Sequence, residues 1–281
     1  MKLRVVQASE IIPIVSELCI KANEQLPEDL CETMRMAIEN ETYPPAKEIL
    51  DVLRENARIA ALEHVPACQD TGMTVVYAEV GQNVHIEGNF EEAVQEGIRQ
   101  GYVNGYLRKS VVRDPFDRVN TGDNTPGILH VRLVPGDKIR LTVAPKGAGS
   151  ENMSRMTMLT PAQGLEGAFQ FVMETVRKAG ANPCPPMILG IGIGGNFETA
   201  PLLAKTALLD PLNVRNPDPF YADLELEWLN QINATGIGPQ GLGGKTTCLS
   251  VHIRAMATHI ACLPVAVSVG CHVNRHSSVE V

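Results

Sequence analysis

The 281-residue sequence has no long apolar run and no excess of positive charge. A membrane-spanning helix needs about 20 predominantly apolar residues, and no stretch of this chain approaches that length. The apolar run at residues 11–15 is broken by Pro13 and is too short for a signal peptide. The formal net charge of −8 lacks the positive footprint of proteins that bind nucleic acid or membrane surfaces. We therefore expect a cytoplasmic protein that has neither a nucleic acid nor a membrane as partner.

Closely spaced cysteine pairs are also missing. The seven cysteines include no CxxC pair, which structural zinc sites and ferredoxin-type clusters typically use. Their odd number and the expected compartment are a poor fit to a disulfide framework, so they are interpreted as free thiols. Cys19 and Cys31 lie in a helical region and are expected in the core, as is Cys262. The pattern around Cys248 leaves its role open.

Internal repeats, low-complexity tracts and recognisable linkers are absent from the sequence as well. Residues 8–62 have apolar side chains spaced three and four apart, which is typical of amphipathic helices. The remainder mixes short β-like runs with helices, without a regular alternation of the two. We therefore predict a mixed α and β (α+β) fold in a single domain, with a helical lead-in at about 8–62 and a body at about 63–281.

Several elements of the body can be placed from their patterns. Residues 128–133 and 139–143 flank the turn Pro135-Gly136-Asp137, which predicts a β-hairpin. Thr160 precedes a proline and is the expected N-cap of a helix. Strands are expected at 73–80 and 187–193, and helices at 90–106, 161–178, from about 198, and 219–233.

Polar or glycine-rich clusters interrupt the apolar segments at five places. Loops of this composition are where binding and catalytic sites are usually built. The clusters are PACQDTG (66–72), YLRKSVVRDP (106–115), APKGAGSEN (144–152), GIGIGGNFE (190–198) and GIGPQGLGGKTT (236–247).

Three cysteines have surroundings that do not suit a hydrophobic core. Cys68 lies in PACQDTG, Cys184 stands between prolines that fix its backbone, and Cys271 begins a polar run. Together they predict three distant thiolates that converge on one centre. Three cysteine ligands on a cubane of four irons leave one iron open as a Lewis acid. A zinc site with cysteine and histidine ligands stays open as an alternative.

Two glycine-rich clusters and one histidine allow further interpretations. GIGIGGNFE satisfies the dinucleotide-binding pattern GxGxxG, with Asp210 about 20 residues on, but the repeating βαβ units of that fold are missing. GIGPQGLGGKTT has Pro239 in place of the first glycine of a phosphate loop, so Lys245 is expected on a structural loop or against a carboxylate. His259 is expected to be a hydrogen-bonded core residue unless a carboxylate faces it and makes it an acid-base group.

Seven segments in one order resemble class I fumarate hydratase and its relative L-tartrate dehydratase, over about residues 60–271. They are PACQDTG, LRKSVVRDP, KGAGSEN, NPCPP, GGNFE, GLGGKTT and VGCH. The resemblance implies the N-terminal domain type of class I fumarase and a 4Fe-4S cluster. The implied cluster ligands are Cys68, Cys184 and Cys271. The implied substrate contacts are Gln69, Asp70, Arg108 and Gly149, and Asp70 is expected to pair with His259 in acid-base catalysis.

The resemblance also implies a partner chain. Family members that work as single chains continue into a C-terminal domain with further substrate-binding side chains, whereas this chain resembles the α subunit of a two-subunit enzyme. We expect a β subunit to complete the site, in a heterodimer or a dimer of heterodimers. The expected substrate is a small dicarboxylate. The expected reaction is the reversible hydration of fumarate to (S)-malate, with dehydration of L(+)-tartrate to oxaloacetate as the alternative.

Overall fold

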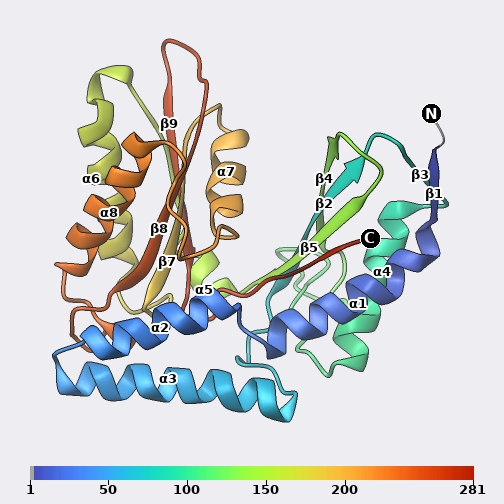
Figure 1. Cartoon of the computed structure of the whole chain (residues 1–281), viewed down its shortest axis with the longest axis horizontal. Helices are drawn as coiled ribbons and strands as arrows, with labels where there is room; N and C mark the ends of the chain where they lie inside the picture. Colours follow the sequence, from blue (N-terminus) through green and yellow to red (C-terminus); the bar gives the residue numbers. More distant parts are fainter. Residues whose placement is uncertain (1–2) are drawn as a thin grey trace. The chain divides into compact units, whose positions relative to one another are not determined.

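The computed structural model describes residues 3–281, and the chain divides into two compact units (Figure 1). Unit 1 comprises the residues up to Pro27, residues 57–148 and residues 275–281. Unit 2 comprises residues 28–56 and 149–274. The chain therefore passes from one unit to the other four times, and the predicted helical lead-in is shared between the two units. Within residues 3–281, no helix combines the length and apolar character needed to span a membrane.

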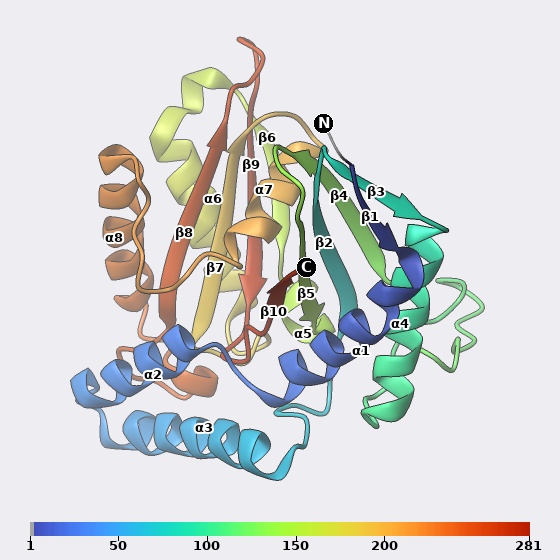
Figure 2. The ribbon, with the colours of Figure 1, turned by 45° about the vertical axis from the view of Figure 1, so that its right-hand side comes forward.

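Unit 1 is a four-stranded sheet with two helices packed on one of its faces (Figure 2). The sheet has the order β10-β5-β2-β4, and β1 pairs with β3 in a separate parallel ribbon. Apolar side chains of the two helices and of the central strands form one buried cluster. The elements are β1 (Arg4–Gln7), α1 (Ala8–Glu24), β2 (Met73–Gly81), β3 (Val84–Glu87), α4 (Phe90–Asn104), β4 (Ile128–Val134), β5 (Ile139–Lys146) and β10 (Ser277–Glu280).

Unit 2 is built around a second four-stranded sheet, of order β6-β9-β7-β8. Helices α6 and α8 cover one face of this sheet and α7 covers the other (Figure 1). The elements of the sheet and its helices are β6 (Arg155–Leu159), α6 (Gly164–Ala179), β7 (Met187–Gly194), α7 (Thr199–Ala207), α8 (Pro219–Asn233), β8 (Cys248–Met256) and β9 (Leu263–Gly270). The other helices are α2 (Glu28–Asn40), α3 (Pro44–Glu63), which crosses into unit 1, and α5 (Ala148–Glu151).

These elements confirm the predicted α+β class and most of the predicted helices and strands. The predicted hairpin is wrong, because β4 and β5 do not pair with each other. Strand β2 lies between them, parallel to β4 and antiparallel to β5. The physical reason is burial: β2 is buried at most of its positions and takes the centre of the sheet, whereas β4 is largely exposed and takes the edge.

The turn between β4 and β5 has to pass over the end of β2. There the main-chain N–H of Gly81 donates to the carbonyl of Lys138 at 2.8 Å. A Cβ atom on Gly81 would lie 2.6 Å from the carbonyl oxygen of Gly136, which is closer than real Cβ contacts allow. A glycine is therefore required where the turn crosses the strand.

The cysteines outside the candidate site differ in their surroundings. Cys19 is fully buried in α1, which confirms the prediction, and burial raises the pKa of its thiol to about 12. Cys248 is buried in β8, and burial likewise raises its pKa to about 12. The core prediction is wrong for Cys31, which is exposed on α2 because its neighbour Leu30 takes the buried position. Cys262 is half-buried between β8 and β9 and lies outside the core clusters.

Candidate active site

Asp70 lies in the loop between α3 and β2, and the surrounding main chain fixes its half-buried carboxylate. Its Oδ1 accepts a hydrogen bond from the N–H of Gly72 at 3.0 Å, and its Oδ2 accepts one from the N–H of Ala148 at 2.8 Å. Its carbonyl oxygen accepts from Nη2 of Arg275. The fold thus joins the PACQDTG and KGAGSEN clusters, which are about 75 residues apart in the sequence. A carboxylate held at both oxygens is suited to act in one fixed orientation.

Arg108 is held beside the same loop through its main chain. The hydroxyl of Thr71 donates to the carbonyl of Arg108 at 2.9 Å. The fully buried Asn124 donates to the carbonyl of Gly72 at 3.1 Å and accepts from the main-chain N–H groups of residues 110–111. The guanidinium of Arg108 is exposed. The structure therefore fixes the main chain of Arg108 beside the loop that carries Asp70 and leaves its side chain exposed.

Cys68 and Gln69 precede Asp70 in the same loop. Cys68 is half-buried, and its Sγ lies 3.5 Å from Oε1 of Gln69. Gln69 is exposed. Unit 1 thus carries a thiol, an amide, a carboxylate and a guanidinium within one loop and its immediate neighbour.

Unit 2 brings Cys184 and Cys271 to the same end of its sheet. Cys184 precedes β7, Cys271 follows β9, and these two strands are antiparallel. Cys184 has a left-handed backbone with φ of 54°. Its carbonyl lies 2.9 Å from Nδ1 of His272, which donates when that nitrogen carries the proton. The two predicted ligands therefore lie on turns that contact each other.

Gln240 completes this end of unit 2, and sequence reasoning missed it. Both its main-chain N–H and its side-chain Nε2 donate to the carbonyl of Pro185 at 2.8 Å. Its side chain also lies 3.4 Å from Nδ1 of His272. The surrounding GIGPQGLGGKTT cluster resembles a phosphate loop, and that pattern points to Lys245 and not to the glutamine. The cluster instead supports the Cys184 turn.

Gly149 lies close to the same turn. A Cβ atom on Gly149 would meet the carbonyl oxygen of Asn182 at 3.5 Å, two residues before Cys184. Gly149, Cys184 and Cys271 are thus neighbours in unit 2, whereas Cys68, Asp70 and Arg108 are neighbours in unit 1. Across residues 3–281, no three His, Cys, Asp or Glu side chains are arranged around a single metal ion. A cluster makes a different demand, because each thiolate binds a different iron.

His259 is exposed in the connection between β8 and β9, so the prediction of a core histidine is wrong. Its Nδ1 accepts from the N–H of Ala261 at 3.2 Å. The residue lies before the start of β9, whereas Cys271 lies after its end. Eight strand residues at about 3.3 Å each separate the two ends by roughly 25 Å. His259 also lines a largely apolar cavity of about 410 Å³ with Leu165, Phe220, Leu224, Ile260 and Cys262.

The glycines of the GIGIGGNFE cluster are explained by helix packing. A Cβ atom on Gly190 would lie 2.0 Å from the carbonyl oxygen of Ala204, and one on Gly192 would lie 2.1 Å from that of Ala200. Helix α7 therefore packs directly on the backbone of β7. Asp210, the candidate ribose ligand, forms a two-point ion pair with Arg254. These contacts remove the sequence argument for a nucleotide site.

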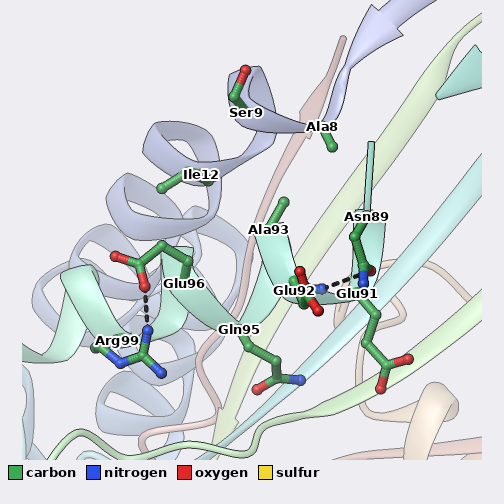
Figure 3. A pocket seen from close by; sticks show the side chains of 10 residues that line it. All are labelled: Ala8, Ser9, Ile12, Asn89, Glu91, Glu92, Ala93, Gln95, Glu96 and Arg99. Carbon is green, nitrogen blue, oxygen red and sulfur yellow. Dashed lines mark hydrogen bonds and ion pairs between the residues drawn. The ribbon is translucent and has the colours of Figure 1, made fainter. Parts of the chain in front are cut away.

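An acid-rich hollow of about 710 Å³ opens in unit 1 between the first turns of α1 and α4 (Figure 3). Glu91, Glu92 and Glu96 line it, and Arg99, the one cation of its lining, is paired with Glu96. Its negative charge disfavours a dicarboxylate. The full lining is Ala8, Ser9, Ile12, Asn89, Glu91, Glu92, Ala93, Gln95, Glu96 and Arg99, which includes none of the predicted site residues.

A family model described as fumarate hydratase (Fumerase) matches residues 12–280 of the chain. A protein of Methanocaldococcus jannaschii, provisionally named as an L(+)-tartrate dehydratase alpha subunit, is 39% identical over 275 residues, which cover 95% of this chain and 96% of that protein. An L(+)-tartrate dehydratase alpha subunit of Escherichia coli is 34% identical over 277 residues, covering 97% and 91%. Its counterpart in Shigella sonnei is 32% identical with the same coverage.

Glu41 clamps the loop that carries Gln240. Its buried carboxylate accepts from the main-chain N–H groups of Tyr43, Lys245 and Thr246 and from the Thr246 hydroxyl, at 2.9–3.1 Å. Burial alone would raise the pKa of Glu41, but these hydrogen bonds together outweigh it and lower the pKa below 4.5. The ionised form is therefore the one that stabilises the fold.

The Glu41→Gln substitution should lower the free energy of unfolding by about 1–3 kcal/mol at neutral pH, because it removes a charged acceptor of several hydrogen bonds. A group with a lowered folded-state pKa stabilises the fold above the ordinary pKa, and this contribution is lost as the pH falls through the folded-state value. The deficit of the variant should therefore shrink below about pH 4.5. Urea unfolding at neutral and acid pH measures both effects. The exposed Glu39→Gln is the control, and an equal loss in the two variants would contradict the clamp.

Proposed function

Because this chain belongs to the fumarate hydratase family of hydro-lyases, we propose that it is the cluster-carrying α subunit of a 4Fe-4S enzyme that hydrates fumarate to (S)-malate. The observation that carries the proposal is the fixed carboxylate of Asp70, held at the junction of two polar clusters and two residues from Cys68. The names of the relatives favour a second candidate substrate, L(+)-tartrate, whose dehydration gives oxaloacetate. Both substrates are small dicarboxylates.

The proposed cluster ligands are Cys68, Cys184 and Cys271. The contacting turns of Cys184 and Cys271 support this set. A second support is the buried guanidinium of Arg275, which donates to the carbonyl oxygen of Asp70, two residues from the proposed ligand Cys68. Thiolates are also the ligands that iron-sulfur clusters use. When bound, such a cluster supplies an open iron that acts as a Lewis acid on the substrate hydroxyl.

The remaining proposed roles fall to side chains beside Asp70. The exposed guanidinium of Arg108 can hold a substrate carboxylate through two parallel hydrogen bonds. Gln69 and the main chain at Gly149 are proposed as further substrate contacts. A β subunit is proposed to supply the rest of the pocket, since the relatives are named as alpha subunits. Asp70 is proposed to move the proton of the attacking or leaving water, with His259 as its partner.

The geometry restricts how Asp70 and His259 can meet. The Cα atoms of Cys68 and Asp70 are at most about 7 Å apart, so a cluster on the three cysteines keeps Asp70 at the Cys184 and Cys271 end. His259 of the same chain is roughly 25 Å from that end. A hydrogen bond between the two side chains needs about 3 Å. We therefore infer that His259 serves Asp70 of a second copy of the chain, which a dimer of heterodimers provides.

The first test is turnover by the chain with and without its β subunit, assayed anaerobically on fumarate and on L(+)-tartrate. We expect the complex to turn over one of the two at a rate at least about a hundredfold above the α chain alone, because the isolated chain lacks part of the pocket. Product formation followed by absorbance or chromatography distinguishes the substrates. If the complex acts on neither dicarboxylate, or if the α chain alone is equally active, the proposed function is wrong.

Cluster formation should protect three of the seven cysteines from alkylation. In the metal-free chain, iodoacetamide should label Cys31, Cys68, Cys184 and Cys271, whereas Cys19 and Cys248 resist because burial raises the pKa of each thiol to about 12. After anaerobic reconstitution with iron and sulfide, labelling of Cys68, Cys184 and Cys271 should stop. The exposed Cys31 is the internal control and should stay labelled. Continued labelling of Cys68 in the brown, reconstituted protein would remove it from the ligand set.

The Asp70→Asn and His259→Asn variants should each lose turnover of the assembled enzyme by at least about a hundredfold while keeping the cluster absorbance. If each site takes Asp70 from one chain and His259 from another, co-assembly of the two variants restores activity. Random pairing places one intact site in half of the dimers, so about a quarter of the wild-type rate should return. If co-assembly of the two variants restores no turnover, His259 does not act on Asp70 of another chain.

A further inference from the structure

Arg275 is a buried cation with an unusual set of contacts. Its side chain is 5% exposed, and its Nη2 donates to the carbonyl oxygen of Asp70. Its Nε and Nη1 are buried, and neither has a hydrogen-bond partner among residues 3–281. Burying a guanidinium whose donors are not all hydrogen-bonded is costly, and buried donors in native proteins are nearly always paired. A residue kept in this state calls for a functional reason.

The surroundings of Arg275 indicate that reason. The side chains of Arg275 and Asp70 lie on the same side of Gly147. A Cβ atom on this glycine would lie 3.2 Å from Oδ2 of Asp70 and 3.9 Å from Nη2 of Arg275. The guanidinium therefore acts on Asp70 in two ways. It holds the main chain of Asp70 directly, and it places a positive charge close to the carboxylate. Removing the charge would leave the carboxylate near the proposed thiolate of Cys68 without compensation.

The position of Arg275 in the chain adds a second argument. The carboxylate of Asp70 is held by Ala148 and its carbonyl by Arg275. These are the residues at which the chain passes between unit 1 and unit 2, at 148/149 and at 274/275. The residue on the far side of the first crossing is Gly149, and Cys271 lies four residues before the second. Asp70 is thus fixed by the residues of unit 1 that adjoin these two crossings.

We propose that Arg275 is a positioning residue for Asp70. It fixes the Asp70 main chain through the Nη2 hydrogen bond, and its buried charge compensates two anions, the Asp70 carboxylate and the proposed thiolate of Cys68. The inference rests on the proposed function, in which Asp70 moves a proton. The role is distinct from that of Arg108, whose exposed guanidinium is free to contact the substrate.

The test compares Arg275→Gln and Arg275→Lys in the complex with the β subunit. Displacing a reacting group by about 1 Å can cost on the order of a hundredfold in rate, so Arg275→Gln should lower kcat by about that factor. Its KM for the dicarboxylate should stay within about threefold of wild type, because the residue does not touch substrate. Arg275→Lys keeps the charge but loses the planar fork, so it should recover part of the rate. Arg132→Gln is the control, since Arg132 is an exposed arginine of β4 paired with Glu79.

A second measurement does not depend on activity. Hydrogen–deuterium exchange of the peptide covering residues 66–72, measured on the α chain, should become faster in Arg275→Gln by about tenfold or more and stay unchanged in Arg132→Gln. Exchange and kcat that both match wild type in Arg275→Gln would overturn the proposal. A large rise in KM with unchanged kcat would also overturn it, because that result assigns Arg275 to substrate binding.

If Arg275→Gln does not fold, Arg275→Lys takes its place in the exchange measurement. Wild-type exchange together with a wild-type rate in Arg275→Lys then overturns the proposal. If the wild-type complex turns over no dicarboxylate, the proposed function is wrong. Hydrogen–deuterium exchange of residues 66–72 then still tests whether Arg275 fixes the Asp70 main chain.

Discussion

The antiparallel pairing of β7 with β9 determines which candidate site residues can meet. It brings the residue before β7 and the residue after β9 to one end of the sheet, where Cys184 and Cys271 lie on contacting turns. The same pairing sends the connection between β8 and β9, with His259, to the opposite end. The proposed cluster requires Asp70 near the end of the sheet that carries Cys184 and Cys271. The proposed acid-base pair requires Asp70 near His259, at the opposite end. The proposal that two chains share each site meets both demands.

Much of the fold could be predicted from local patterns, and the failures have a common cause. The three-and-four spacing of residues 8–62 and the run at 187–193 are local signals, and the structure has helices and a buried strand there. The pairing of β4 with β5 failed because strand order depends on which strand is buried most, which is a property of the whole sheet. Cys31 and His259 were misplaced for a similar reason. Cys31 lies beside the buried stripe of α2, which Leu30, Met34 and Ile38 form at a spacing of four, and not on it. His259 lies in a connection without such a periodicity.

The candidate site shows the same division. The residues around Cys68 and Asp70 attract attention in the sequence because polar groups gather there, and the structure joins that loop to KGAGSEN through the N–H of Ala148. Gln240 and Arg275 could not be found in this way. Their roles arise from contacts with residues 55 and 205 positions away, and their own surroundings in the sequence give no signal. A residue that positions others is recognisable only once its partners are placed.

The discontinuous path of the chain sets an order in which the site can mature during synthesis. Unit 1 receives its strand β10 and the Arg275 contact from residues 275–281, whereas β5 and the Asp70 loop are made more than 120 residues earlier. Residues 149–274 of unit 2 are translated in between, including Cys184 and Cys271. Asp70 therefore obtains its last anchor only after every cysteine of the chain has been made. A nascent chain that has reached residue 274 therefore carries all seven cysteines, while the Asp70 loop still lacks its contact with Arg275.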